Sequence, residues 1–150
     1  MAKLQAKSRP NRAAKAAARA AVPAIRPASA ATRRRVRQAV LAASSKMALD
    51  PVVLDVRALA DFCDFFFLCH GANLRQVETI AEAVEFALQQ QEGLRPARRE
   101  GRGEWIVLDY LDFIVHVFSP RSRRFYDLER LWNRAPRLPL PAAARPQERP

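Results

Sequence analysis

The chain has 150 residues and a formal net charge of +11, with 26 lysine and arginine residues against 15 aspartate and glutamate residues. This length favours a single domain, and no apolar run approaches the roughly 18 residues of a membrane-spanning helix or resembles the core of a secretory signal. The two cysteines, Cys63 and Cys69, lie in an apolar run, which indicates free thiols in a reducing compartment and not a disulfide framework.

The basic charge is concentrated at one end of the chain. Residues 1–49 hold 12 of the basic residues and no acidic residue, whereas residues 50–150 hold 14 arginines and all 15 acidic residues. Residues 1–32, rich in alanine and basic side chains, are predicted to be a disordered basic arm. The same composition is typical of an organelle transit peptide, which we keep as the less favoured alternative.

The folded body is predicted over residues 33–134 and begins with a helix and two strands. Residues 33–46 place three apolar residues on a narrow stripe and predict an amphipathic helix. Pro51 prevents this helix from continuing, and the β-branched run 52–57 predicts a strand. The continuous apolar run 65–70 is typical of a strand that is buried on both faces.

The strongest helical pattern follows these two strands. Residues 74–91 repeat apolar side chains at i, i+3, i+4 and i+7, which predicts a helix with one face against a sheet. Asn73 is a favourable N-cap, and Gly93 is a favourable residue at the C-terminal end. Residues 95–100 predict a short edge strand.

The remaining elements are a hairpin and a short helix. Strands are predicted at residues 105–110 and 113–118, a helix at 127–132, and a disordered tail rich in proline and alanine at 135–150. Only one strand-to-strand step is bridged by a long helix. The order therefore predicts an α/β fold of the α+β type, with a single mixed β-sheet of four to five strands flanked by helices.

The sequence offers few groups for catalysis or metal binding. Cys63 and Cys69 are spaced unlike zinc ligands, and no nucleophile motif surrounds a possible pair of Cys69 with His116. Asp109 and Asp112 are three apart, so they would converge on a metal only across a turn. No phosphate-binding glycine motif is present. We therefore predict no catalytic residue, no metal site and no cofactor.

The predicted hairpin has apolar residues on both faces, but the body has only one strong amphipathic helix to cover them. An uncovered apolar and aromatic surface typically marks a protein interface. Trp105 and Tyr110 lie near strand ends, where large aromatic side chains often anchor a partner. These residues point to a binding module before any family is considered.

Four segments resemble, in order and spacing, the ribosomal silencing factor family, RsfS or Iojap: VVLDVR, DFFFLCHGANLRQVETIAEAVE, GEWIVLDYLDFIVHVF and RFYDLERLW. The resemblance extends over residues 36–133 and implies a reduced nucleotidyltransferase-like fold without enzymatic activity. It also implies binding to the L-fourteen protein of the large ribosomal subunit and steric hindrance of small-subunit joining. That action represses translation, and the implied location is the bacterial cytoplasm.

The resemblance also implies where the partner binds. The hairpin segment matches the family pattern EW..LDYGD, except that a leucine stands where most members have glycine and adds apolar surface. The partner-binding residues predicted from this match are Trp105, Leu108, Asp109, Tyr110, Leu111 and Asp112.

Other interpretations stay open at this point. The main alternative function is a small nucleotidyltransferase-like enzyme acting on RNA or a nucleotide, which requires carboxylates that converge on Mg²⁺. A protein that binds RNA through its arm alone would leave the hairpin unexplained. We expect the arm to add non-specific attraction to ribosomal RNA, and a homodimer is a second possible cover for the apolar surface. No membrane partner is expected.

Overall fold

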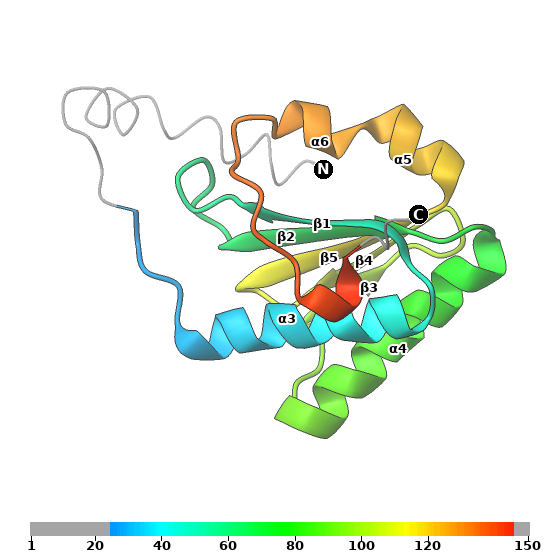
Figure 1. The fold of residues 1–150 in the computed structure, drawn as a ribbon, viewed down its shortest axis with the longest axis horizontal. Helices are drawn as coiled ribbons and strands as arrows, with labels where there is room; N and C mark the ends of the chain where they lie inside the picture. Colours follow the sequence, from blue (N-terminus) through cyan, green and yellow to red (C-terminus); the bar gives the residue numbers. More distant parts are fainter. Residues whose placement is uncertain (1–24, 146–150) are drawn as a thin grey trace.

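The computed structural model describes residues 25–145, which form one β-sheet with helices on both faces (Figure 1). The elements in chain order are α3 (Ala30–Ser45), β1 (Leu49–Asp55), β2 (Phe65–His70), α4 (Leu74–Glu92), β3 (Arg98–Glu100), β4 (Trp105–Asp109), β5 (Phe113–Phe118), α5 (Pro120–Tyr126), α6 (Leu128–Leu131) and the 3-10 helix η2 (Ala142–Ala144). The five strands have the order β1-β2-β5-β4-β3. Only β2 and β5 are parallel, so the predicted mixed sheet is confirmed.

Capping residues determine where the two long helices begin and end. The Asn73 side chain accepts a hydrogen bond from the Gln76 N–H, and Gly93 ends α4 in the left-handed conformation with φ 62°, as predicted. Helix α3 begins at Ala30 and not at residue 33, because the Ser29 hydroxyl caps it by accepting from the Thr32 N–H at 3.0 Å. This cap was not predicted, because residues 29–32 resemble the basic arm in composition.

The two faces of the sheet are covered differently. Helices α3 and α4 pack on one face, here called the first face, and α5 and α6 lie over the other, the second face (Figure 1). The first-face core includes Phe65, Phe67, Ile106, Leu108, Phe113 and Val115. The second-face core is smaller and includes Leu54, Phe66, Leu68 and Phe118. The first face is therefore the main source of apolar burial.

Strand β1 starts earlier than the predicted range of 52–57. It begins at Leu49 and passes through Pro51, and its pairing with β2 shifts register between Leu49 and Val52. Proline is tolerated in such a bulge because no ladder hydrogen bond needs its missing N–H. Proline at this position therefore ends the helical segment without excluding the strand.

The structure differs from the disordered tail that was predicted over residues 135–150. The Asp55 N–H donates to the Pro136 carbonyl at 2.8 Å, and the Leu138 N–H donates to the Val53 carbonyl at 2.9 Å. Residues 136–138 thus extend the sheet beyond β1, and η2 packs against α3 with Ala144 buried. The free edge of β1 supplies these bonds, and composition alone does not show it. Residues 146–150 lie outside the described residues.

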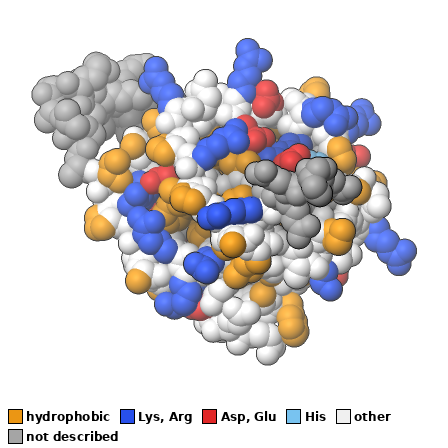
Figure 2. Space-filling view, in the orientation of Figure 1, with side chains coloured by type: hydrophobic (Ala, Val, Ile, Leu, Met, Phe, Trp, Pro, Cys, Tyr) orange, Lys and Arg blue, Asp and Glu red, His pale blue; other side chains and the backbone are white. Residues whose placement is uncertain are grey.

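The helical region after β5 is also longer than the predicted helix at 127–132. It consists of α5 and α6, and α5 is capped by the Ser119 side chain with Pro120 in its first turn. Serine followed by proline is a typical helix start and indicates α5 in the sequence. Basic side chains are spread over the whole face shown in the space-filling view, its upper edge near these helices included (Figures 1 and 2).

The predicted basic arm of residues 1–32 divides at about residue 25. Residues 1–24 lie outside the described residues, so their disorder is untested. Arg26 belongs to the folded body, because its guanidinium donates to Asp64 at 2.8 Å and to the Cys63 carbonyl at 2.6 Å. Within residues 25–145, no helix is both long and apolar enough to cross a membrane.

Candidate functional site

The hairpin of β4 and β5 turns sharply through Leu111 and Asp112. The Tyr110 N–H donates to the Phe113 carbonyl at 3.0 Å, and Leu111 adopts the left-handed conformation with φ 72°. The Asp109 carboxylate accepts from the Leu111 N–H at 2.8 Å and so stabilises this backbone. The left-handed conformation is the one that glycine adopts most easily, so leucine costs conformational energy here. Its side chain is displayed to solvent, 64% exposed.

Two of the predicted partner-binding residues do not lie on the surface. Leu108 is fully buried, and Tyr110 is only 5% exposed, with its ring stacked on Phe113 at a centroid distance of 5.0 Å. Both side chains belong to the first-face core that α3 and α4 cover. The interpretation of Tyr110 as an exposed anchor is therefore wrong. Strand alternation sends it to the same side as Leu108, and the turn begins only after it.

Four residues of β4 and β5 face the second face of the sheet. Trp105, Val107, Asp109 and Ile114 are each partly exposed there, and only Trp105 and Ile114 of the four pack against the second-face core. We call these four residues the open strip. Leu111 and Asp112 continue it at the turn, where both are exposed. The predicted residues Trp105, Asp109, Leu111 and Asp112 thus lie near one another, whereas Leu108 and Tyr110 lie behind them.

Trp105 is held firmly at one end of the open strip. Its ring stacks on Phe118 at 5.0 Å and contacts Tyr126 at 4.6 Å, measured between ring centroids. Its indole Nε1–H donates to His116 Nδ1 at 3.2 Å. An aromatic side chain fixed in this way loses little conformational freedom when a partner covers its remaining surface.

This hydrogen bond sets the state of His116. An indole can only donate, so Nδ1 must accept and the ring proton belongs on Nε2. Burial lowers the pKa of His116 to about 4, because the charged ring would lose its hydration among Phe66, Phe118 and Trp105. His116 is therefore neutral at physiological pH and positions Trp105.

The groups weighed for chemistry do not assemble a catalytic site. Burial raises the pKa of Cys63 and of Cys69 to about 12, so both thiols stay protonated and weakly nucleophilic. Asp112 accepts from the Thr32 hydroxyl at 3.5 Å, and Asp109 holds the turn. No group of three or more histidine, cysteine or acidic side chains that would fit a metal ion occurs among residues 25–145.

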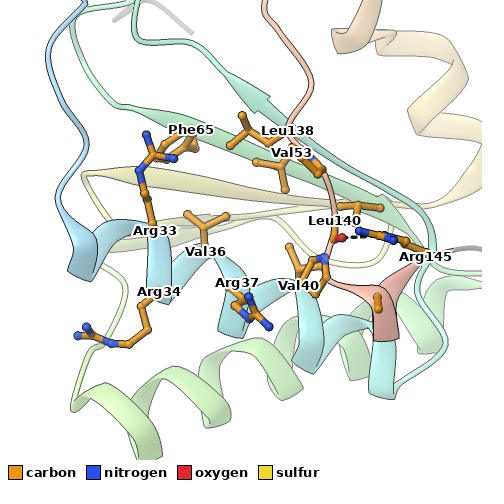
Figure 3. Close-up of a pocket in the computed structure, with 13 residues that line it drawn as sticks. Arg33, Arg34, Val36, Arg37, Val40, Val53, Phe65, Leu138, Leu140 and Arg145 are labelled. Atoms are coloured by element: carbon orange, nitrogen blue, oxygen red, sulfur yellow. Dashed lines mark hydrogen bonds between the residues drawn. The ribbon is translucent and has the colours of Figure 1, made fainter.

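A cavity of about 690 Å³ lies between α3 and residues 138–145 (Figure 3). Its floor is apolar and its rim is basic, with the lining residues including Val36, Val40, Val53, Phe65, Arg33, Arg34, Arg37 and Arg145. Arg34 is engaged by Glu92 at 2.8 Å. The described lining contains no carboxylate, thiol or imidazole, so this cavity gives the enzyme alternative no acid–base or metal-binding group.

Comparison with known proteins decides the family. A family model described as "Ribosomal silencing factor during starvation" matches residues 29–150. The chain belongs to the ribosomal silencing factor family. The ribosomal silencing factor of Halalkalibacterium halodurans is 38% identical over 104 residues, which cover 68% of this chain and 88% of that protein. The chloroplastic protein Iojap of Zea mays is 31% identical over 100 residues, or 67% of this chain and 44% of that protein.

Two solved structures have the fold of this ribosomal silencing factor family member. A protein from Chromobacterium violaceum superposes with a TM-score of 0.65 at 30% identity, covering 67% of this chain and 85% of that one. A protein from Bacillus halodurans gives a TM-score of 0.64 at 34% identity, covering 72% and 99%. The expected α+β fold and the family resemblance are both confirmed.

The aromatic residues of α5 lie in the segment RFYDLERLW that carries the family resemblance, but they are not among the predicted partner-binding residues. Phe125 is 78% exposed and Tyr126 is 49% exposed, and Tyr126 contacts Trp105 at the end of the open strip. Sequence reasoning missed them because α5 itself was not predicted. The Ser119–Pro120 pair would have indicated the helix and thereby placed these aromatic residues beside the hairpin.

Proposed function

We propose that this protein silences ribosomes by binding the large subunit at its L-fourteen protein, through the open strip and the hairpin turn. The bound body then occupies space that the small subunit needs, and translation is repressed without any reaction being catalysed. The observation that supports this most strongly is the uneven cover of β4 and β5. Their first face is sealed by helices, whereas apolar side chains of their second face remain partly exposed.

The surface has the composition of a protein interface. Trp105 supplies a preorganised aromatic anchor, and the 64% exposed Leu111 supplies an apolar one. Asp109 and Asp112 lie at the edge of these anchors with partial or full exposure. Carboxylates at a rim favour partners with basic surface and speed their encounter. A ribosomal protein that faces phosphate-rich RNA meets this requirement.

The location and the arm follow from the same proposal. A ribosome-binding regulator related to the bacterial proteins acts in the cytoplasm, and residues 1–24, with six basic and no acidic residues, attract ribosomal RNA without sequence preference. A homodimer through the open strip would compete with the ribosome for the same surface. The folded body does not need the arm for this competition.

Co-sedimentation with separated ribosomal subunits tests the proposal. We expect the full chain to pellet with the large subunit and not with the small one. Light scattering should show slower and less complete joining when the large subunit is preincubated with the protein. Pelleting with the small subunit alone, or normal joining at saturating protein, would refute the proposed function.

A further inference from the structure

The region of α5 and α6 has a charge unlike that of the rest of the body after α3. Residues 120–137 contain six arginines and only two acidic residues, Asp127 and Glu129, whereas residues 50–150 together are close to neutral. Glu129 is already paired, since it accepts from Arg123 at 3.1 Å and lies 3.5 Å from Arg137. The other four arginines are therefore largely uncompensated.

The short helix α5 separates these side chains into two faces. Ser122 is buried on the inner face, and Arg123 contacts His70 at 3.0 Å and the Leu49 carbonyl at 3.3 Å. Arg121, Arg124 and Phe125 have the spacing i, i+3 and i+4, so they share the outer face of the helix.

The outer face of α5 is exposed and cationic. All three of its residues are exposed, and Phe125 is the most exposed large apolar side chain among residues 25–145. Neither Arg121 nor Arg124 has a hydrogen bond or ion pair within the described part of the chain. The Ser119 and Ser122 hydroxyls donate to Glu104 and lower the pKa of its carboxyl, and the charge of Arg121 adds a smaller effect in the same direction.

We propose that the outer face of α5 binds ribosomal RNA at an unpaired nucleotide. The base stacks on Phe125, and the phosphates on either side of it lie against Arg121 and Arg124. This inference rests on the proposed function, which brings the protein to the large subunit. An aromatic ring flanked by uncompensated arginines suits unstacked RNA, because every base offers a π face and every linkage a negative charge.

The charge argues against the other classes of partner. The centres of protein interfaces are depleted of charged residues, whereas here two arginines flank a single exposed ring. A membrane-binding helix needs a broader apolar face than one phenylalanine on a helix of seven residues. RNA requires only a short footprint with both features together.

The position of α5 connects this surface to the open strip. Tyr126 follows Phe125 and packs on Trp105 at 4.6 Å, with its ring 5.0 Å from that of Phe125. A partner protein on Trp105 and an RNA segment on Phe125 would thus be neighbours. The protein would then bind the large subunit where a ribosomal protein and ribosomal RNA lie next to each other.

The test uses matched variants of the full chain and a short single-stranded RNA of mixed sequence, followed by fluorescence anisotropy. Phe125→Ala should weaken RNA binding about tenfold through lost stacking. Phe86→Ala removes a ring of similar exposure, 67%, on the far helix α4 and should leave binding unchanged. Both side chains are exposed, and circular dichroism melts will show that both variants fold.

The arginines are tested through the salt dependence of the same binding. The double variant Arg121→Ala, Arg124→Ala should reduce the slope of log affinity against log salt by about 1.4, from two lost phosphate contacts. The control variant, Arg75→Ala with Arg102→Ala, removes two exposed arginines outside α5. Its salt slope should fall by the same amount only if the location of the arginines does not matter. Equal behaviour of test and control variants would overturn the inference.

Subunit pelleting separates this inference from the proposed function. If the unaltered protein failed to pellet with the large subunit, the proposed function would fall, while the RNA titration would still decide whether α5 binds RNA. If Phe125→Ala weakened pelleting but not RNA binding, α5 would contact a protein, and the RNA inference would be wrong. Loss in both assays, with both controls intact, is the result we expect.

Discussion

The two faces of the sheet differ in how completely they are covered, and β4 shows the difference within one strand. Ile106 and Leu108 are fully buried beneath α4, whereas Trp105, Val107 and Asp109 on the opposite face stay partly exposed. Alternation along a strand thus assigns neighbouring residues to different tasks. In β4, the first-face residues should determine stability, and the partly exposed second-face residues should determine binding.

The largest change in stability is expected from substitution of Tyr110, on the first face of the sheet. Tyr110→Ala leaves a cavity beside Phe113 and should reduce the free energy of unfolding by about 3 kcal/mol. Tyr110→Phe is the matched control, because the buried hydroxyl has no hydrogen-bond partner among residues 25–145. Urea unfolding should therefore show a near-native midpoint for Tyr110→Phe. An equally stable Tyr110→Ala protein would contradict the burial of this ring.

Substitutions of Trp105 test the binding role of the open strip. Trp105→Ala should weaken large-subunit binding by about 2 kcal/mol, or roughly thirtyfold, because it removes a preorganised aromatic anchor. Trp105→Phe keeps an aromatic ring over Phe118 but loses the bond to His116, and we expect binding within a few-fold of native. Pelleting titrations measure both. Native binding by a folded Trp105→Ala protein would exclude the open strip from the interface.

His116 makes the second face sensitive to pH. Its pKa is about 4 in the folded protein and about 6.5 in the unfolded chain, so below pH 6.5 the unfolded chain takes up a proton that the folded protein does not. Stability should therefore fall as the pH falls, by roughly 1 to 2 kcal/mol between pH 6.5 and pH 5, and this group should add little further loss below about pH 4.

Unfolding in urea at several pH values, with His116→Leu alongside, isolates this contribution. Burial and the neighbouring Arg123 also lower the pKa of His70, so a smaller loss of the same sign should persist in the variant. A variant with the full pH dependence of the native protein would show that His116 is not the titrating group.

Deleting the basic arm should have the smallest effect of these changes. Deleting residues 1–24 removes six basic residues and should lower affinity at low salt and flatten the salt dependence, since fewer counterions are released. It should leave the stability difference between Tyr110→Ala and Tyr110→Phe unchanged. The deletion must stop before Arg26, because Arg26 binds Asp64 and Cys63 in the body. Identical salt slopes with and without the arm would show that it does not contact RNA.

Much of the fold could be predicted from the sequence because its signals are local. Helix α4 has its cap residues and its apolar stripe within one segment, and β2 and β5 have the predicted boundaries. The ordered segment 136–138 could not be predicted in this way. Its hydrogen bonds are to Val53 and Asp55, far away in the chain, and nothing in its own composition indicates them.

The candidate site was predicted only in part for a related reason. The family pattern marks Trp105 to Asp112 as one block, but a linear motif does not say which side chains face outward. The strand and the left-handed turn at Leu111 divide the block, with Leu108 and Tyr110 inside. The exposed Phe125 was missed because its helix was missed.

Photo-crosslinking tests the central claim most directly. A photoreactive amino acid is placed at Leu111 in one protein and at Phe86 in another, two sites of nearly equal exposure at 64% and 67%. Each protein is then irradiated with purified large subunits, and the crosslinked ribosomal protein is identified by mass spectrometry. We predict a crosslink to the L-fourteen protein from position 111 and none to it from position 86. A crosslink to L-fourteen from position 86, with none from position 111, would contradict the account.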